Sequence, residues 1–431
     1  MNVSFIIPTR NNLPYLKIAY GSIRKNYPTA EIIILDDNST DGTNEWVNSQ
    51  SGQGDSNTVY YRNDGRQVGH TVLYDKGVEL SSNEVFTIFH ADMVCGPNYV
   101  ENLMKHLKPQ GVVAATRIEP PLHPEGKEKI VKDFGIYAED FRELDFVAFC
   151  KSMQQDAKNK NITTRGIFAP WMMYKKDFLA IGGHDKFFAP FPYEDSDIFQ
   201  RFILAAYEIK QSRDAFVYHF TCRGHRWTEQ VQKDDHFYKL CCAKNSLHFI
   251  RKWGSWIEND ELSYPVINHL YNIGLVVKNC PAQLLGMLEP WCSTIYCDAD
   301  IKKYIESVQP GTPFDLTKRV KPLDAEKTNT VLVSFDGNLL SNEGMKFITQ
   351  LSKVLTQTAE SGDIKPADLM DDKTVTFEHD IFKIEVRAMD IFDNILVHAD
   401  HYGFKLLPQP DTDPYCMNEL FKVFEQTKHL K

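Results

Sequence analysis

At 431 residues, the chain is too long for one typical hydrophobic core, so two or three domains are expected. With 42% hydrophobic and 25% charged residues, its composition is that of a globular protein and excludes an extensively disordered one. A formal net charge of -10, without a long basic run, disfavours a nucleic-acid partner.

The nine cysteines are an odd number and show neither the spacing of a disulfide-rich domain nor a C-x-x-C zinc pattern. Reduced thiols in the cytoplasm are therefore the simplest interpretation. The first residues lack the basic and apolar regions of a signal peptide, and no run of about 18 apolar residues predicts a membrane span. We therefore expect a cytoplasmic protein without a transmembrane segment, whereas the sequence indicates nothing about its oligomeric state.

Strand-like and helix-like segments alternate over the first quarter of the chain. Apolar stretches predict strands over residues 3–7, 31–35, 59–62, 85–89 and 111–116. Helical patterns are found over residues 13–26, 43–49, 70–80 and 97–107. Such alternation predicts crossover units and a mostly parallel sheet, that is, an α/β domain.

The composition of the later segments suggests further divisions of the chain. Residues 116–165 are irregular and fit either an acceptor-facing loop or a surface insertion. After a first domain over residues 1–240, residues 241–322 are expected to form a mainly helical extension that ends in a charged linker. Residues 323–431 are expected to form a small C-terminal α/β domain, in which we find no motif that carries chemistry.

Polar loops directly follow the first two predicted strands. The first loop contains Pro8, Thr9 and Arg10, and the second contains Asp36 and Asp37. In an open parallel sheet, ligands bind beyond the carboxyl ends of the strands, so both loops are expected to face one crevice. A carboxylate there can accept hydrogen bonds from a nucleotide base or a ribose. Helix capping is the alternative, but it explains the residues that follow the aspartate pair better than the pair itself.

The opening pattern closely resembles that of family 2 glycosyltransferases, which have the GT-A fold and use nucleotide-sugar donors. The resemblance covers roughly residues 1–255. It implies an inverting, metal-dependent transfer of a sugar from a nucleoside-diphosphate donor, most commonly UDP, to a hydroxyl of a glycan or another acceptor. It also implies that Pro8, Thr9 and Asp37 line the nucleotide pocket. The alternative is a catalytically inactive protein that binds a nucleotide-sugar or a glycan.

The segment His90-Ala91-Asp92 stands where the family carries Asp-x-Asp. The acidic groups of that motif hold a divalent cation, Mn²⁺ or Mg²⁺, on the donor diphosphate. The resemblance implies that Asp92 contacts this cation, whereas His90 replaces a carboxylate and favours the inactive alternative. A strand that ends in His219 can supply a further metal ligand, and mixed nitrogen and oxygen ligation suits Mn²⁺ better than Mg²⁺. A purely structural histidine is the other interpretation of His219.

Glu194 and Asp195 are predicted to open a helix, because apolar residues recur after them at helical spacing. Acidic residues complement the dipole at a helix N-terminus, which would explain the cluster without any catalytic role. However, the preceding residues 182–185 resemble the Gly-Gly-Phe-Asp segment of the family. The resemblance implies that Asp195 is the general base, with Glu194 as its neighbour, because an inverting transfer needs a base to take the acceptor proton.

Weaker expectations fall on four residues. Arg226 and Trp227 belong to an Arg-x-x-Arg-Trp segment close to the Gln-x-x-Arg-Trp motif of processive family members, which suggests diphosphate contact and sugar stacking. Arg66 is either a phosphate contact or a solvated loop residue, and Trp171 is either an acceptor platform or a core aromatic. A dinucleotide-dependent oxidoreductase is disfavoured, because no Gly-x-Gly-x-x-Gly turn follows the first strand.

Overall fold

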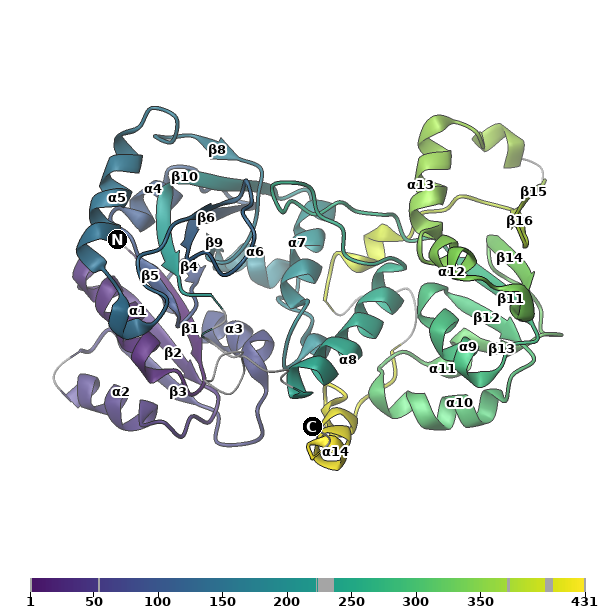
Figure 1. Cartoon of the computed structure of the whole chain (residues 1–431), viewed down its shortest axis with the longest axis horizontal. Helices are drawn as coiled ribbons and strands as arrows, with labels where there is room; N and C mark the ends of the chain where they lie inside the picture. The colour runs from purple at the N-terminus through teal and green to yellow at the C-terminus, as the bar shows by residue number, and fades with distance from the viewer. Residues whose placement is uncertain are drawn as a thin grey trace. The chain divides into compact units, whose positions relative to one another are not determined.

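The computed structural model describes residues 2–52, 55–221, 223, 236–369, 373–399 and 406–429. The chain divides into two compact units (Figure 1). The first unit comprises Met1–Tyr238 and Asn259–Val266, and the second comprises Lys239–Glu258 and Ile267–Lys431. Within the described residues, no helix is both long enough and apolar enough to cross a membrane.

Within the described residues of the first unit, ten strands form one mixed sheet. Its main path has the order β3-β2-β1-β4-β9-β6-β10-β5, while β7 pairs with β6 and β8 pairs with β10. The strands are β1 (Val3–Thr9), β2 (Glu31–Asp36), β3 (Thr58–Arg62), β4 (Val85–Ile88), β5 (Met93–Cys95), β6 (Gly111–Glu119), β7 (Lys129–Val131), β8 (Thr163–Thr164), β9 (Trp171–Tyr174) and β10 (Glu208–His219). β1 to β4 run parallel, and β9 is antiparallel to both β4 and β6. Because β6 and β10 are also parallel, they share the direction of β1 to β4, which confirms the expected mostly parallel sheet.

The helices of this unit lie between the strands in the chain, as crossover connections require. They are α1 (Leu13–Asn26), α2 (Thr43–Gly52), α3 (Gly69–Leu80), α4 (Tyr99–Met104), α5 (Glu143–Gln155), α6 (Lys175–Ala180), α7 (Glu194–Leu204) and the start of α8 (His236–Trp253). α3 packs closely on β1 and β2, and Gly77 permits this approach. A Cβ atom at this position would lie only 2.3 Å from the side chain of Ile6. This approach brings the first turns of α3 to the edge of the sheet where β1 ends.

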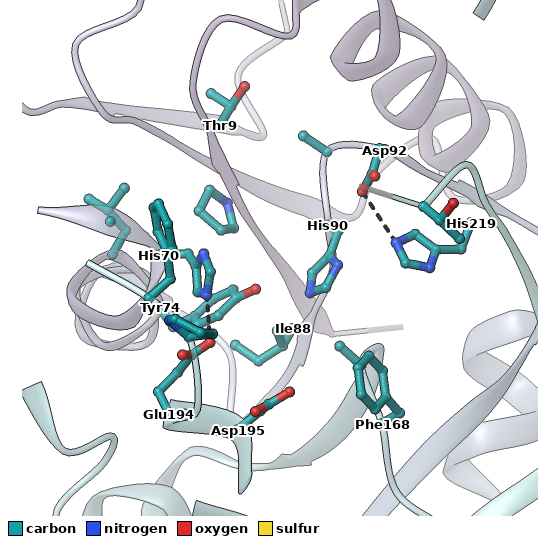
Figure 2. Close-up of a pocket in the computed structure, with 18 of the residues that line it drawn as sticks. Thr9, His70, Tyr74, Ile88, His90, Asp92, Phe168, Glu194, Asp195 and His219 are labelled. Carbon is teal, nitrogen blue, oxygen red and sulfur yellow. Dashed lines mark hydrogen bonds and ion pairs between the residues drawn. The ribbon is translucent and has the colours of Figure 1, made fainter. Parts of the chain in front are cut away.

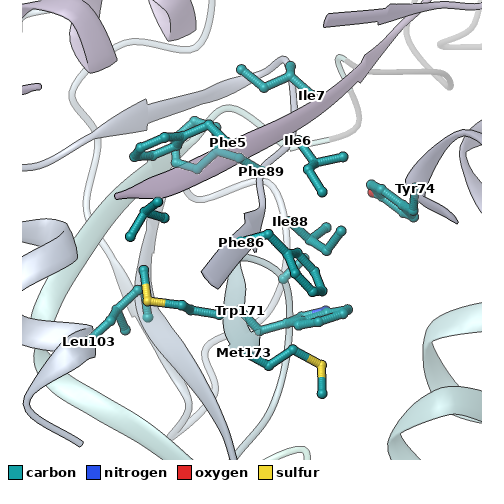
Figure 3. Packing of buried hydrophobic residues seen from close by; sticks show 14 of the residues in the cluster. Phe5, Ile6, Ile7, Tyr74, Phe86, Ile88, Phe89, Leu103, Trp171 and Met173 are labelled. Atoms are coloured by element: carbon teal, nitrogen blue, oxygen red, sulfur yellow. The ribbon is translucent and has the colours of Figure 1, made fainter. Parts of the chain in front are cut away.

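The core of the first unit is built around β1 and β4 (Figure 3). Phe5, Ile6, Phe86 and Ile88 are buried, and Trp171 of β9 packs edge-on against Phe86 with ring centroids 5.7 Å apart. Parallel strands covered on both faces are apolar along their whole length, which is why their sequences predicted them well. The helix expected over residues 97–107 is shorter in the structure. It begins at Tyr99, because Asn98 has a left-handed backbone conformation, and it ends at Met104.

The second unit contains a six-stranded sheet of order β13-β12-β11-β14-β16-β15 among its described residues. The strands are β11 (Ile273–Lys278), β12 (Thr294–Cys297), β13 (Val320–Pro322), β14 (Val331–Asp336), β15 (Val375–His379) and β16 (Phe382–Val386). β11 to β14 are parallel, whereas β16 is antiparallel to both β14 and β15. The helices are α9 (Ala282–Leu288), α10 (Ile301–Val308), α11 (Leu316–Arg319), α12 (Asn342–Thr349), α13 (Leu351–Ser361) and α14 (Met417–Thr427).

This architecture corrects the expected division after residue 240. β11, β12 and β13 lie within the segment expected to be a helical extension, and they share one sheet with β14 from the segment expected to be a separate domain. The linker expected over residues 318–327 includes the end of α11 and all of β13, and its Arg319 is buried. Short apolar runs such as Thr294–Cys297 cannot be distinguished from buried helix by periodicity, which explains the wrong boundary.

Candidate active site

A cavity in the first unit lies where β1, β4, β6 and β10 end (Figure 2). These strands run in the same direction, so the loops and residues at their carboxyl ends meet at one edge of the sheet. The candidate site residues that line the cavity are Pro8, Thr9, Arg10, Asp37, Asp92, Trp171, Glu194, Asp195 and His219. The structure therefore gathers in one place residues that the sequence separates by up to about half the length of the chain.

The Asp37 carboxylate holds the loop that leads into α3. It accepts hydrogen bonds from the Asn63 side-chain amide at 2.7 Å and from the backbone N–H groups of Val68 at 3.1 Å and Gly69 at 2.8 Å. The guanidinium of Arg10 donates to the backbone carbonyl of Asp37. The loops after β1 and β2 are thus fastened together at the wall of the cavity.

Two further residues expected at the donor, Asp36 and Arg66, do not line the cavity. Asp36 is 0% exposed, and its carboxylate accepts hydrogen bonds from the Tyr60 hydroxyl at 2.7 Å and from Arg62 at 3.0 Å. Arg66 is also absent from the cavity wall, whereas its neighbour Gln67 lies there. Within the aspartate pair, only Asp37 lines the cavity, while Asp36 stabilises the end of β2.

Three side chains form a cluster with the donor atoms of a metal site. One ligand atom from each of His90, Asp92 and His219 lies within 4.8 Å of the others. Nε2 of His219 is 3.7 Å from a carboxylate oxygen of Asp92, and its Nδ1 lies 3.0 Å from Glu119 (Figure 2 shows the first pair). If the Nδ1–H donates to Glu119, the lone pair of Nε2 faces the carboxylate of Asp92. A histidine oriented by a carboxylate in this way is the usual arrangement for a metal ligand.

Glu119 is itself held by two cations inside the protein. Its carboxylate oxygens lie 3.0 Å from Arg117 and 2.9 Å from Lys129, with all three side chains largely buried. Burial alone would raise the pKa of Glu119, but His219, Arg117 and Lys129 hold it well below its usual range. Burial, together with the neighbouring His219, lowers the pKa of His90, so this imidazole is neutral and can offer a lone pair.

The start of α7 brings two carboxylates to the cavity. Glu194 is 5% exposed and lies 2.5 Å from Nε2 of His70, which comes from the first turn of α3 (Figure 2). Burial opposes ionisation of Glu194, but the charge and hydrogen bond of His70 lower its pKa overall. Its second oxygen, Oε2, is buried without a hydrogen-bond partner among the described residues. The half-buried Asp195 also lines the cavity, and one of its oxygens accepts the N–H of Ser196 at 2.7 Å.

The third acidic residue of this helix has a structural function. Asp197 is completely buried and pairs with Arg201 at 2.8 Å, one helical turn away. Arg201 also donates to the carbonyl oxygens of Ile181 and Gly183. This pair anchors α7 to the segment before it and so fixes the position of Glu194 and Asp195.

Two residues of the cavity wall were not predicted from the sequence, and one predicted residue belongs mainly to the core. No motif in the sequence pointed to His70 or Glu119. Extending the strand expected over residues 111–116 by three residues would have placed Glu119 at its carboxyl end. Trp171 touches the cavity but is 2% exposed and packs in the core, as its structural interpretation required. Arg226 and Trp227 lie outside the described residues, while the backbone N–H of nearby Arg223 donates to Asp92 at 2.9 Å.

Comparisons with known proteins find glycosyltransferases similar to the N-terminal region. Residues 4–178 match the model of glycosyl transferase family 2. The chain is 27% identical over 122 residues to an undecaprenyl-phosphate mannosyltransferase of Micrococcus luteus, covering 28% of this chain and 50% of that protein. It is 29% identical over 115 residues to an uncharacterized glycosyltransferase of Mycoplasma genitalium, covering 26% of this chain and 38% of that protein. The matched regions therefore span half or less of these relatives.

Solved structures give more distant similarities. GalNAc-T7 with UDP, GalNAc and Mn²⁺ aligns with a TM-score of 0.39 and 14% identity, over 51% of this chain and 43% of that one. Residues 1–349 of S. aureus TarS in complex with UDP align with a TM-score of 0.35 and 16% identity, over 51% and 60% of the two chains.

The family match includes the loop after β1, Asp37, the His90-Ala91-Asp92 turn and Glu119, which together form much of the cavity wall. The sheet described above is the α/β arrangement that the GT-A expectation requires. Residues 4–178 of this chain are therefore similar to glycosyl transferase family 2.

Proposed function

We propose that this chain is an inverting, metal-dependent glycosyltransferase. It transfers a sugar from a nucleoside-diphosphate donor, for which UDP is our first choice, to a hydroxyl of a glycan or another acceptor. The observation that carries the proposal is that one cavity gathers Asp37, the cluster of His90, Asp92 and His219, and the carboxylate of Asp195. A nucleotide-binding wall, a cation-binding cluster and a proton acceptor are the three elements that this reaction needs.

The residues of the cluster fit a divalent cation. Two imidazoles and one carboxylate favour Mn²⁺ over Mg²⁺, because Mg²⁺ prefers oxygen ligands. When bound, the cation supplies positive charge that stabilises the departing nucleoside diphosphate. Glu119 orients the imidazole of His219 toward this position, which leaves less conformational freedom to lose on binding.

The remaining roles belong to side chains of the cavity wall. Asp195 accepts the proton of the acceptor hydroxyl as the hydroxyl oxygen attacks the anomeric carbon. The unpartnered Oε2 of Glu194 can accept a hydrogen bond from a sugar hydroxyl, while His70 holds the other oxygen. Asp37, with the backbone of Pro8 and Thr9, faces the base or ribose of the nucleotide.

The inactive binding protein is the competing proposal. Its main support was the replacement of a metal-binding aspartate by His90. The ring of His90 offers a nitrogen atom beside Asp92 and His219, so on this proposal the replacement changes the ligand set and does not remove a ligand. This placement supports the transferase over the inactive protein.

Isothermal titration of UDP, GDP, CDP and dTDP, each with and without Mn²⁺, tests the donor site. We expect one nucleotide to bind with Mn²⁺ and to lose most of its affinity in Asp92→Ala. Hydrolysis of the matching nucleotide-sugar by the wild type, lost in Asp195→Asn, tests catalysis separately. Nucleotide binding without any sugar transfer or hydrolysis would favour the inactive protein, and the absence of binding would refute the donor site.

A further inference from the structure

The second unit has a cavity of its own. It has a volume of about 620 Å³ and lies between the end of α8, the segment around Trp291 and the junction of α12 with α13. Its walls include two tryptophans, Trp256 and Trp291, with Asn268 and Gln350 among the polar residues. This volume lies within the range of small-molecule and cofactor sites, roughly 300–1,000 Å³.

The charges of this cavity cancel. Among its lining residues, only Glu258 and Lys353 carry a formal charge, and their side chains pair at 2.7 Å. The hydrogen bond from Lys353 lowers the pKa of Glu258, so the pair stays ionised near neutral pH. A wall without net charge disfavours nucleotides, phosphates and strongly basic or acidic peptides, and it favours a neutral ligand.

The aromatic and polar groups of the wall are those that suit a sugar ring. Trp256 is 38% exposed and meets Phe249 edge-on, with ring centroids 5.8 Å apart. An indole provides a broad apolar surface for the C–H groups on one face of a pyranose. The amides of Asn268 and Gln350, by contrast, both donate and accept hydrogen bonds, as a ligand with many hydroxyl groups requires.

Ion pairs and a hydrogen bond connect the segments that form the walls of the cavity. Arg251 of α8 pairs with the fully buried Glu289 at 2.7 Å, and Arg319 pairs with the same carboxylate at 2.5 Å. This buried ion network joins the helix that precedes Trp256 to the turn that carries Trp291. On the opposite side, the hydroxyl of Ser352 donates to the carbonyl of Gly254 at 3.0 Å. A preformed wall loses little conformational entropy when it binds a ligand.

We infer that this cavity binds a neutral oligosaccharide, with a pyranose ring stacked on Trp256 and its hydroxyls bonded by Asn268 and Gln350. The ligand class follows from the lining, and the link to catalysis rests on the proposed function, in which such a chain is the acceptor or its product. No covalent step occurs at this site. It serves to hold a glycan on a unit separate from the candidate active site.

The test measures the binding of maltohexaose, cellohexaose, chitohexaose and mannohexaose to the full chain by saturation-transfer NMR and tryptophan fluorescence. We expect at least one of these probes to bind with a dissociation constant on the order of 1 mM. Trp256→Ala should weaken that binding at least about fivefold, and Trp256→Phe should retain most of it. Gln350→Ala, at an exposed position, should weaken it without affecting folding. Leu339→Ala, which is 63% exposed in the same unit and outside the cavity, is the matched control.

Nucleotide binding by the same variants separates this inference from the proposed function. Loss of oligosaccharide binding in Trp256→Ala and Gln350→Ala, with UDP binding unchanged, would support a glycan site in the second unit. Failure of all four probes to bind, or binding that both variants retain, would overturn it whatever the protein does with UDP. Absence of UDP binding with intact, Trp256-dependent oligosaccharide binding would refute the donor site alone.

Discussion

Replacing Glu289 with glutamine should strongly destabilise the second unit. The carboxylate is 0% exposed and accepts hydrogen bonds from two buried guanidinium groups, at 2.7 Å and 3.0 Å from Arg251 and at 2.5 Å from Arg319. The hydroxyl of Tyr304 adds a further contact at 3.2 Å. Glutamine keeps the volume but removes the charge, so two buried cations lose their counterion.

The expected cost follows from that loss. Breaking a buried ion pair by removing one partner costs about 3–5 kcal/mol, because the remaining charge is left unpaired. For a unit of roughly 150–250 residues, each kcal/mol lowers the melting temperature by about 2–4 °C, so a fall on the order of 10 °C is expected.

Differential scanning calorimetry measures this fall, and hydrogen exchange assigns the weakened transition to peptides of the second unit. Glu306→Gln is the matched control, because its exposed carboxylate lies 3.9 Å from Lys302 and contributes little. A loss below about 1 kcal/mol for Glu289→Gln would refute the reasoning, since it would mean that the two arginines find other partners or water.

Three further predictions follow from the charges of the two units. Burial raises the pKa of Glu289, but Arg251 and Arg319 lower it to about 2. The contribution of Glu289 to stability is therefore complete above its unfolded pKa of 4.5 and is lost as the pH falls toward 2. Acid unfolding monitored by circular dichroism should show a loss of about 3 kcal/mol in the free energy of unfolding, and Glu289→Gln should not show this loss. Asp195→Asn should lower turnover by about 10²–10⁴ while nucleotide affinity in calorimetry stays unchanged, and equal losses in both would contradict its assignment as the base. His90→Ala should weaken Mn²⁺ binding at least about tenfold in electron paramagnetic resonance titrations, whereas His90→Asp should shift the preference toward Mg²⁺; unchanged metal affinity in both variants would exclude His90 as a ligand.

The strands β1, β2 and β4 and the loops after them were predictable because these strands are buried on both faces. A strand such as Glu31–Asp36 is a short apolar run that ends abruptly in polar residues, and the structure places the carboxyl end of that run at the cavity. The candidate residues Thr9, Asp37 and Asp92 could therefore be located without coordinates. Their placement agrees with the sequence, although their roles stay predictions until they are tested.

Other parts of the site left no periodic signal. The strand expected over residues 111–116 continues to Glu119 in the structure, where it is β6. Arg117 and Glu119 look like surface residues in the sequence, yet both are buried and form an ion pair with each other. His70 and Glu194 are 124 positions apart, and only the packing of α3 against the loop before α7 brings them together. Pairing between distant charges is a property of the folded chain, which a single sequence does not display.

The loop that leads into α3 connects Asp37 to Glu194, at two parts of the candidate active site. Asp37 holds the N–H of Gly69, the next residue is His70, and His70 holds Glu194 beside Asp195. Gly69 leaves no room for adjustment, because a Cβ atom there would overlap the backbone of Pro190. Under the proposed function, a donor that contacts the Asp37 carboxylate would therefore also affect the position of Glu194 at the start of α7. Under the proposed function, thermodynamic reciprocity requires that the factor by which a bound acceptor changes the affinity for the donor equals the factor by which the donor changes the affinity for the acceptor.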